Sequence, residues 1–192
     1  GLVDSEDVFK SCKAYEDDIA AAGGIDIQIL GIGRTGHIGF NEPGSGPETL
    51  TRLVTLDSLT RRDAARDFLG EANVPRHAIT MGVGTILAAH KLFLLAWGEG
   101  KASILTKTIE GKQTDTIPAT FLQQHDNCTF CIDQAAASHL TRERHPWLVG
   151  RIKWTKATTR KAVLWLAQKT GKALLKLVDE DYTENGMSDL LI

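Results

Sequence analysis

The chain of 192 residues has few of the features that mark specialised protein classes. It contains only three cysteines, without the spacing of a secreted disulfide framework. No apolar run reaches the roughly eighteen residues that a membrane-spanning helix needs. The first residues, GLVDSEDVFK, lack the charged and apolar regions of a signal peptide. We therefore expect a cytoplasmic protein without a membrane segment.

A strong charge of either sign is also missing. The formal net charge is -2, which gives no broad field to attract nucleic acid or an anionic membrane. With 42% hydrophobic and 24% charged residues, the composition is that of an ordinary globular domain. Any anion site must therefore be built locally, and neither nucleic acid nor a membrane is expected as a partner.

Two of the cysteines, Cys128 and Cys131, are spaced as in many metal and redox motifs. They lie in CTFCI, a segment typical of a β-strand, and strand residues three apart point to opposite faces. No second CxxC or neighbouring histidine pair completes a zinc site. The sequence therefore predicts neither a metal site nor a disulfide here.

Helical and strand patterns alternate along residues 1–140. Apolar spacings of three and four predict a helix over 5–21, ended by Gly23 and Gly24. Further helices are predicted over 58–69, 86–90, 101–110 and 135–140. Strands are predicted over 25–30, 92–97 and 128–132, and a brief strand and turn over 79–84. Because strands separated by helices favour parallel crossovers, the expected fold is α/β. The chain would hold part of a Rossmann-like, doubly wound and mainly parallel sheet.

Two of these strands carry patterns that predict their burial. In the first, Ile25, Ile27 and Ile29 alternate with polar residues, so the isoleucines are expected to face the core. The segment 92–97 is continuously apolar, which is typical of a strand buried on both faces.

The composition changes near residue 141. Trp147, Trp154 and Trp165 cluster beyond this point, and a helix with a basic outer face is predicted over 159–170. The tryptophans are expected to pack against one another and not to form a binding platform. We therefore divide the chain into a domain at 1–140 and a Trp-rich helical extension at 141–192.

The most informative segment is GIGRTGHIGFNEP, which follows the first predicted strand. Histidine is the side chain whose charge changes near neutral pH, and Glu42 follows His37 closely enough to orient or polarise its imidazole. This combination is typical of a ligand loop in an α/β enzyme. Glycines let such a backbone approach its ligand closely, and four of them stand here: Gly31, Gly33, Gly36 and Gly39.

The segment GIGRTGHIGFNEPGS closely resembles the signature of glucosamine-6-phosphate deaminases, also called isomerases. The resemblance continues through TMGVGTIL and WGEGKA and covers roughly residues 15–140, and the later residues look like a long form of the family with a further domain. It implies a Rossmann-like enzyme that converts glucosamine 6-phosphate and water to fructose 6-phosphate and ammonia without an organic cofactor. The related phosphogluconolactonases keep a glycine turn and a histidine but not GFNEP.

The same resemblance implies roles for single residues. His37 matches the imidazole that moves a proton at the sugar ring oxygen, and Glu42 matches the carboxylate that partners it. Arg66 and Lys101 match the cations that hold the substrate phosphate. Lys101 also opens a predicted helix, whose N-terminus favours an anion. The implied partner is a phosphorylated amino sugar, and the family's monomers, trimers and hexamers leave a homo-oligomer open.

The chain departs from the family at two single positions. Thr35 stands where many members carry Asp or Asn. A hydroxyl accepts a hydrogen bond but does not stabilise an imidazolium as an anion would, so we expect a weaker or differently tuned ring-opening step. Val54 stands where allosterically controlled members place a lysine, although Arg52 is retained.

A larger departure concerns the base that removes the C2 proton. In the family this carboxylate, and a glycine loop for phosphate, belong to a preceding half, and nothing here matches either. Glu16, Asp17 and Asp18 lie in the first helix, where acidic side chains are usually solvated. We therefore expect a portion of the enzyme that is inactive as a deaminase by itself.

Two other functions remain open. A non-catalytic sugar-phosphate-binding or regulatory module would account for Thr35 and for the missing base, but it would have no need of both His37 and Glu42. A sugar-phosphate lactonase would use a similar histidine but should lack the NEP sequence.

Overall fold

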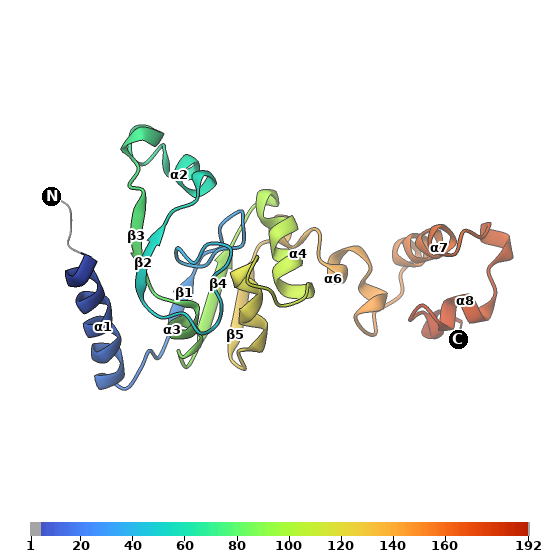
Figure 1. The fold of residues 1–192 in the computed structure, drawn as a ribbon. Coiled ribbons are helices and arrows are strands. Elements are labelled where there is room, and N and C mark those ends of the chain that lie inside the picture. The colour runs from blue at the N-terminus through green and yellow to red at the C-terminus, as the bar shows by residue number, and fades with distance from the viewer. Residues whose placement is uncertain (1–4, 192) are drawn as a thin grey trace. The chain divides into compact units, whose positions relative to one another are not determined.

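The structure, a computed structural model, describes residues 5–191 and contains two compact units, divided between residues 137 and 138 (Figure 1). In the first unit the α-helices are α1 (Ser5–Ala21), α2 (Ser58–Ala64), α3 (Val83–Leu87), α4 (Ala102–Glu110) and α5 (Gln134–Ala137). Its strands are β1 (Gln28–Leu30), β2 (Arg52–Thr55), β3 (His77–Thr80), β4 (Leu92–Ala96) and β5 (Cys128–Ile132). Three short 3-10 helices complete it: η1 (Glu71–Asn73), η2 (Glu99–Lys101) and η3 (Pro118–Gln124).

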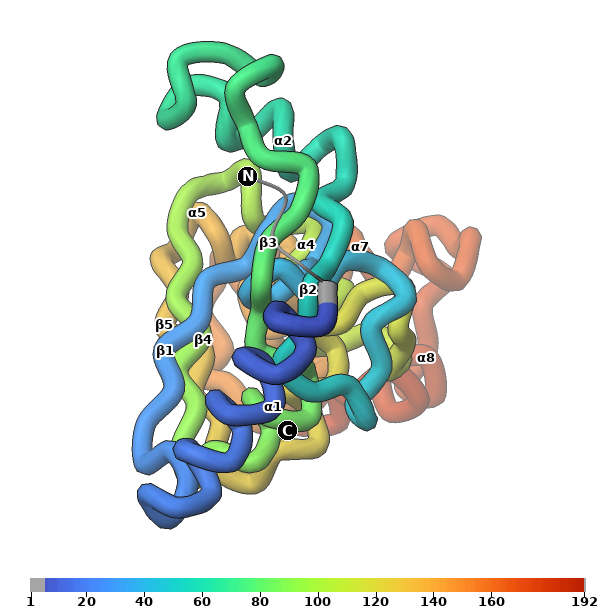
Figure 2. The backbone as a smooth tube through the Cα atoms, turned by 60° about the vertical axis from the view of Figure 1, so that its left-hand side comes forward, coloured from blue at the N-terminus to red at the C-terminus, as the bar shows by residue number. Residues whose placement is uncertain are grey.

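A three-stranded sheet in the order β1-β4-β5 forms the centre of this unit, and both pairings are parallel. The carboxyl end of β1 leads directly into the glycine turn. Figure 2 shows the three strands side by side. Parallel strands need crossover connections, and the segment α4 provides one between β4 and β5. The α/β expectation is therefore confirmed.

The sheet buries one face more completely than the other. The register aligns Leu30 with Leu94 and Phe130 on the face that joins the core. The neighbouring residue Ile29 aligns with Phe93 and is 62% exposed. Because side chains alternate along a strand, burying Leu30 turns Ile29 the other way.

The expectation that Ile27 and Ile29 face the core is therefore wrong, since both are exposed and only Ile25 packs partly against it. The strand also begins at Gln28 and not at Ile25. In β4 the face of Leu92 and Leu94 is fully buried and the opposite face is half-buried. This corrects the prediction of a strand buried on both faces.

An antiparallel pair, β2 and β3, lies beside the parallel sheet and was not predicted as a pair. The brief strand and turn predicted over 79–84 overlaps only the end of β3, because residues 83 and 84 begin α3. Strand β2 was not predicted. Helix α1 packs against β2 (Figure 2), with Val8 and Cys12 buried. Gly23 and Gly24 both take positive φ angles, 90° and 94°, where the chain leaves this helix, as the sequence predicted.

Helix α2 is shorter than predicted. It ends at Ala64, and the chain then turns through Leu69, whose φ of 57° lies in the left-handed region. A helix cannot continue through that conformation. The N-cap is Asp57, whose side chain accepts a hydrogen bond from the Leu59 amide at 2.7 Å.

Glu16 has a structural role that the sequence pattern did not predict. Its carboxylate accepts hydrogen bonds from the Thr51 amide at 2.7 Å and from the Thr85 hydroxyl at 2.6 Å. Burial alone would raise the pKa of Glu16, but these hydrogen bonds outweigh it and lower the pKa. Glu16 therefore joins α1 to the loop before β2 and to α3, whereas it was expected to be solvated like its neighbours.

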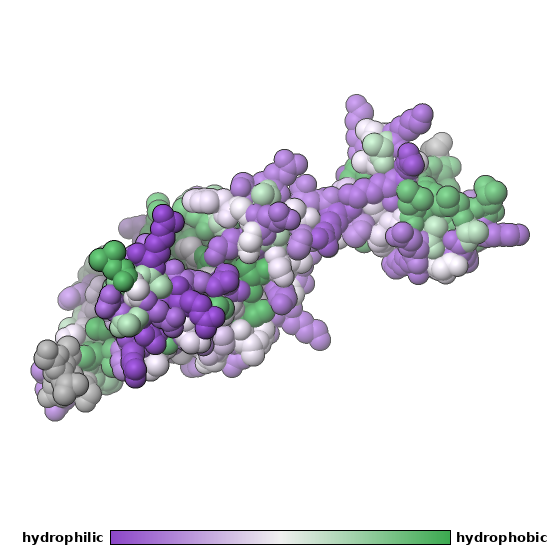
Figure 3. Space-filling view, turned by 90° about the horizontal axis from the view of Figure 1, so that it is seen from above, coloured by the Kyte–Doolittle hydropathy of each residue, from purple (hydrophilic) through white to green (hydrophobic). Residues whose placement is uncertain are grey.

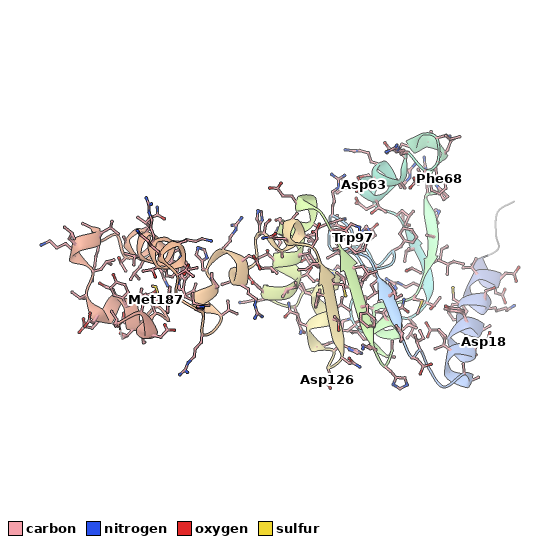
Figure 4. All side chains as sticks on the ribbon, turned by 180° about the vertical axis from the view of Figure 1, so that it is seen from behind. Asp18, Asp63, Phe68, Trp97, Asp126 and Met187 are labelled. Carbon is pink, nitrogen blue, oxygen red and sulfur yellow. The ribbon has the colours of Figure 1, made fainter. Side chains whose placement is uncertain are left out.

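The second unit is helical. Its elements are α6 (Thr141–Arg144), η4 (Pro146–Leu148), α7 (Lys156–Thr170), η5 (Leu174–Lys176), α8 (Asp179–Thr183) and η6 (Ser188–Leu190). Met187, labelled in Figure 4, is fully buried in a cluster with Trp147, against which Trp154 and Trp165 pack. The ring centroids of Trp147 and Trp165 are 5.6 Å apart. The tryptophans therefore pack, as predicted.

Apolar side chains also remain on the surface of this second unit. Leu174, Leu175 and Val178 are all largely exposed, and Figure 3 shows apolar residues in green on this part of the molecule. Among residues 5–191, no helix combines the length and the hydropathy needed to span a bilayer.

Candidate active site

The glycine turn begins where β1 ends. The Gly33 amide donates to the His37 carbonyl at 3.0 Å, and the Gly36 amide donates to the Gly33 carbonyl at the same distance. Gly36 has a φ of 84° and lies against Ile117. A side chain there would be strained and would collide with Ile117, so this tight turn requires glycine.

Gly33 has a different relation to the site. A Cβ atom at this position would overlap the imidazole of His37, at Cε1 and Nε2. The ring occupies the space that any other residue at 33 would fill. By contrast, a Cβ at Gly31 would meet no atom within 4 Å. Gly33 therefore makes room for the His37 ring, and Gly31 imposes no comparable requirement.

Three oxygen atoms surround Nδ1 of His37. The Thr35 hydroxyl is 3.1 Å away, Oε2 of Glu42 is 3.3 Å away, and the Thr60 hydroxyl is 3.5 Å away. The His37 and Glu42 side chains are 17% and 13% exposed, so the group is largely shielded yet still open at one edge. The structure thus brings together all three predicted catalytic residues and adds Thr60.

These contacts favour one tautomer of the neutral imidazole. An ionised carboxylate only accepts hydrogen bonds, and the Thr60 proton is already donated to Oε1 of Glu42 at 2.6 Å. The oxygens of Glu42 and Thr60 thus face Nδ1 of His37 as acceptors, which favours the tautomer with hydrogen on Nδ1. The lone pair then lies on Nε2, where it can take a proton from a bound molecule or return one.

The two oxygens of Glu42 have different surroundings. Oε1 accepts from the Thr60 hydroxyl and, at 3.4 Å, from the Asp57 amide. Oε2 is buried and makes no hydrogen bond within the described part of the chain. Its contact with Nδ1 of His37 is close but not aligned as a hydrogen bond, whereas that of Thr35 is. The carboxylate oxygen facing the ring is thus free to accept a proton or a hydrogen bond.

Lys101 reaches the same turn from the other side. It is the last residue of η2, immediately before α4, so it precedes the helix that it was predicted to open. Its Nζ donates to the Ile32 carbonyl at 2.7 Å. Burial lowers the pKa of Lys101, while Asp63 acts in the opposite direction. The ammonium is therefore partly desolvated next to the turn, as in many anion sites.

An ion pair connects the turn to α2. The Arg34 guanidinium donates from Nε to Asp63 at 2.9 Å, and its Nη2 contacts the second Asp63 oxygen. Figure 4 labels Asp63 on α2. Neither residue was predicted to have a role. Although Arg34 lies inside the glycine motif, sequence alone could not identify its partner 29 residues away.

Arg66 lies outside this group of contacts. It follows the end of α2 and is exposed, so its predicted place on the helix is wrong. Within residues 5–191, no ion pair or hydrogen bond of its side chain is found. Arg66 is therefore available to a ligand, but no protein contact holds it in one position.

Asn41, of the NEP sequence, is fully buried and holds the end of the turn in place. Its amide donates to the Ile38 carbonyl at 2.9 Å and the Met81 carbonyl at 2.7 Å. Its oxygen accepts from Arg52 at 2.9 Å, and Arg52 also donates to Ser45 at 2.8 Å. Burial lowers the pKa of Arg52. Asn41 and Arg52 thus fix the loop that carries Glu42.

The cysteine pair lies away from these residues. Cys128 belongs partly to the core, and burial raises the pKa of its thiol, whereas Cys131 is exposed. Both are free, and they point to opposite sides of β5, as predicted. No group of three potential metal ligands occurs among the residues that the structure describes.

Comparison with known sequences identifies related proteins. The family described as glucosamine-6-phosphate isomerases/6-phosphogluconolactonase matches residues 3–131. A glucosamine-6-phosphate deaminase-like protein of Bacteroides thetaiotaomicron is 49% identical over 191 residues, which are 100% of this chain and 29% of that protein. A glucosamine-6-phosphate deaminase of Shewanella woodyi is 53% identical over 138 residues, covering 72% of this chain and 52% of the relative.

Solved structures agree with these sequence matches. A monomeric glucosamine-6-phosphate deaminase superposes with a TM-score of 0.68 at 43% identity, covering 72% of this chain and 57% of that one. A 6-phosphogluconolactonase from Trypanosoma cruzi gives a TM-score of 0.55 at 26% identity, covering 72% and 54%. The chain spans about half the length of the curated deaminases that it matches. It belongs to the glucosamine-6-phosphate isomerase/6-phosphogluconolactonase family.

Proposed function

We propose that this chain supplies the ring-opening part of a cytoplasmic glucosamine-6-phosphate deaminase, an enzyme that forms fructose 6-phosphate and ammonia. The observation that carries the proposal is the arrangement of His37 with Glu42 at the carboxyl end of β1. Nδ1 of this histidine faces a carboxylate, which favours the neutral tautomer that has its lone pair on Nε2. A general acid–base catalyst needs this arrangement to move a proton repeatedly.

The first step assigned to these residues is sugar ring opening. Nε2 of His37 takes the proton of the C1 hydroxyl and returns it to the ring oxygen as the C1–O5 bond breaks. Glu42 stabilises the imidazolium that exists between these transfers, since its Oε2 already lies 3.3 Å from Nδ1. The later removal of the C2 proton needs a base, and we assign that role to no residue of this chain.

We assign the binding of the substrate phosphate to Lys101 and Arg66. Lys101 supports this role through its partial burial beside the turn, where a charge-assisted contact with phosphate is strong. Arg66 supports it through its exposed and unpaired guanidinium. Lys101 would provide the fixed contact and Arg66 a contact formed on binding.

A lactonase is the second candidate, because the fold resembles that of the 26% identical 6-phosphogluconolactonase. The much higher identity to deaminases favours deamination. A non-catalytic sugar-phosphate-binding module would bind the same ligand without turnover.

The activity is tested with the chain alone and with a chimera. The chimera joins the part of the Shewanella woodyi deaminase that precedes its matched region to the N-terminus of this chain. We expect ammonia from glucosamine 6-phosphate with the chimera and none with the chain alone. Replacing His37→Asn or Glu42→Gln in the chimera should abolish this release of ammonia.

Three results would oppose the proposal. Hydrolysis of 6-phosphogluconolactone without ammonia release would favour the lactonase, and binding without either reaction would favour the module. Ammonia release by the chain alone would contradict the absence of a C2 base.

Binding of fructose 6-phosphate to the chain, followed by NMR of His37, gives a separate measurement if the chimera does not fold. Lys101→Met should weaken that binding, and the exposed Lys107→Met serves as its control.

A further inference from the structure

The hydroxyl of Thr60 is buried in the candidate site, and the formation of helix α2 does not explain why a hydroxyl is present there. Thr60 lies within α2, is only 8% exposed, and does not cap the helix because Asp57 does. Its hydroxyl donates to Oε1 of Glu42 at 2.6 Å. This is a short, charge-assisted hydrogen bond. The geometry therefore directs Thr60 at the carboxylate.

The contact decides how Glu42 faces His37. The terminal torsion of a glutamate is soft, so the carboxylate turns readily unless something holds it. Thr60 holds Oε1, which leaves Oε2 at 3.3 Å from Nδ1 of His37. The Asp57 amide is the other donor to Oε1, but at 3.4 Å it is the weaker one. Thr60 is thus the main restraint on the carboxylate.

Thr60 also acts on the ring itself. Its oxygen is 3.5 Å from Nδ1, and its proton is used by Glu42, so it presents a lone pair to His37. Each acceptor near Nδ1 favours the tautomer with hydrogen on that nitrogen. Thr60 contributes to this directly and through the oriented carboxylate.

We propose that Thr60 is a positioning residue that orients Glu42 and keeps the lone pair of neutral His37 on Nε2. The consequence of this role for ring opening rests on the proposed function, but the effect of Thr60 on the His37 tautomer does not. The proposal can therefore be tested on the chain itself, without any enzyme activity.

The measurement is a long-range proton–nitrogen NMR spectrum of ¹⁵N-histidine-labelled chain at about pH 8, above the ordinary histidine range. The His37 signal is assigned by its loss in His37→Asn. We expect the tautomer with hydrogen on Nδ1 to predominate in the parent. Thr60→Val should lower its ratio to the other tautomer by about fivefold, the effect of one ordinary hydrogen bond. Thr60→Ser should restore it.

Asp63→Asn is the matched control. It weakens another attachment of α2 to the turn, the Arg34 ion pair, and leaves Thr60 in place. If Thr60 only anchors the helix, Asp63→Asn should shift the tautomer as much as Thr60→Val does. That result, or an unchanged tautomer in Thr60→Val, would overturn the proposal. Thr60→Ala, which adds no second methyl group, replaces the valine variant if that variant unfolds.

In the chimera described above, Thr60→Val should lower kcat more than it raises KM, because Thr60 touches Glu42 and not a substrate group. Failure of deamination in the parent chimera would count against the proposed function alone. An altered tautomer in the variant would still support the role of Thr60.

Discussion

The Thr35 hydroxyl lies 3.1 Å from Nδ1 of His37, slightly closer than the nearest oxygen of Glu42 at 3.3 Å. The hydroxyl also has the hydrogen-bond geometry that the carboxylate lacks. A neutral group therefore makes the aligned contact, and the charged group is close but not aligned. This relationship places residue 35 where a charged side chain would act directly on the imidazole.

Replacing Thr35→Asp should keep His37 protonated to higher pH than in Thr35→Asn, because a second carboxylate stabilises the imidazolium. NMR titration of the His37 ring measures this directly. Thr35→Asn is the control, since it has a similar shape without charge. Equal titration curves for the two variants would show that charge at residue 35 has little effect on the ring.

Replacing Gly33→Ala should displace the His37 ring, because the new methyl group would occupy the same space. We expect a loss of about 1–3 kcal/mol in the free energy of unfolding, typical of overpacking, and a changed His37 NMR spectrum. Gly31→Ala is the matched control, since its methyl group meets no atom within 4 Å; its effect should be within about 0.5 kcal/mol. A native His37 spectrum in Gly33→Ala would refute the steric argument.

Replacing Glu16→Gln should destabilise the chain by about 0.5–1 kcal/mol at neutral pH, allowing for solvent screening of a partly exposed group. The folded-state pKa of Glu16 is lowered, so its contribution is present above the ordinary glutamate pKa. It is lost as the pH falls through the folded-state value.

Urea unfolding at about pH 7 and about pH 3 tests this dependence. The difference between the parent and Glu16→Gln should shrink at the acidic pH. Asp18→Asn, on the same helix and exposed (Figure 4), should differ little from the parent at either pH. A difference for Glu16→Gln that persists in acid would mean that its charge is not the cause.

Replacing Arg52→Met should cost about 1.5–3 kcal/mol in the free energy of unfolding, because it leaves the buried Asn41 oxygen without its donor. Arg52→Lys should recover only part of this, since an ammonium cannot reproduce the planar donors that reach both Asn41 and Ser45. Thermal unfolding checks both variants, with the exposed Arg62→Met as control. Full recovery of the unfolding free energy in Arg52→Lys would mean that the positive charge alone, without the planar donors, accounts for the stabilisation.

By itself the sequence determined the α/β class, the glycine turn after β1 and the pairing of His37 with Glu42. These follow from local signals: hydrophobic periodicity, glycines, and residues close together along the chain. Even the opposite orientation of Cys128 and Cys131 follows from the two-residue period of a strand. The same local signals predicted the burial of Ile29 wrongly, because alternation shows that a strand has two faces but not which face is buried.

Only the tertiary structure decided which distant residues meet the turn. Thr60 and Asp63 approach it from α2 and Lys101 approaches it from the end of η2, and Glu16 reaches Thr85 across 69 residues. Hydrogen bonds of this kind depend on the packing of whole elements, which no local spacing encodes. The sequence therefore determined that His37 could act as an acid–base group, and the fold decided which oxygen atoms face its Nδ1.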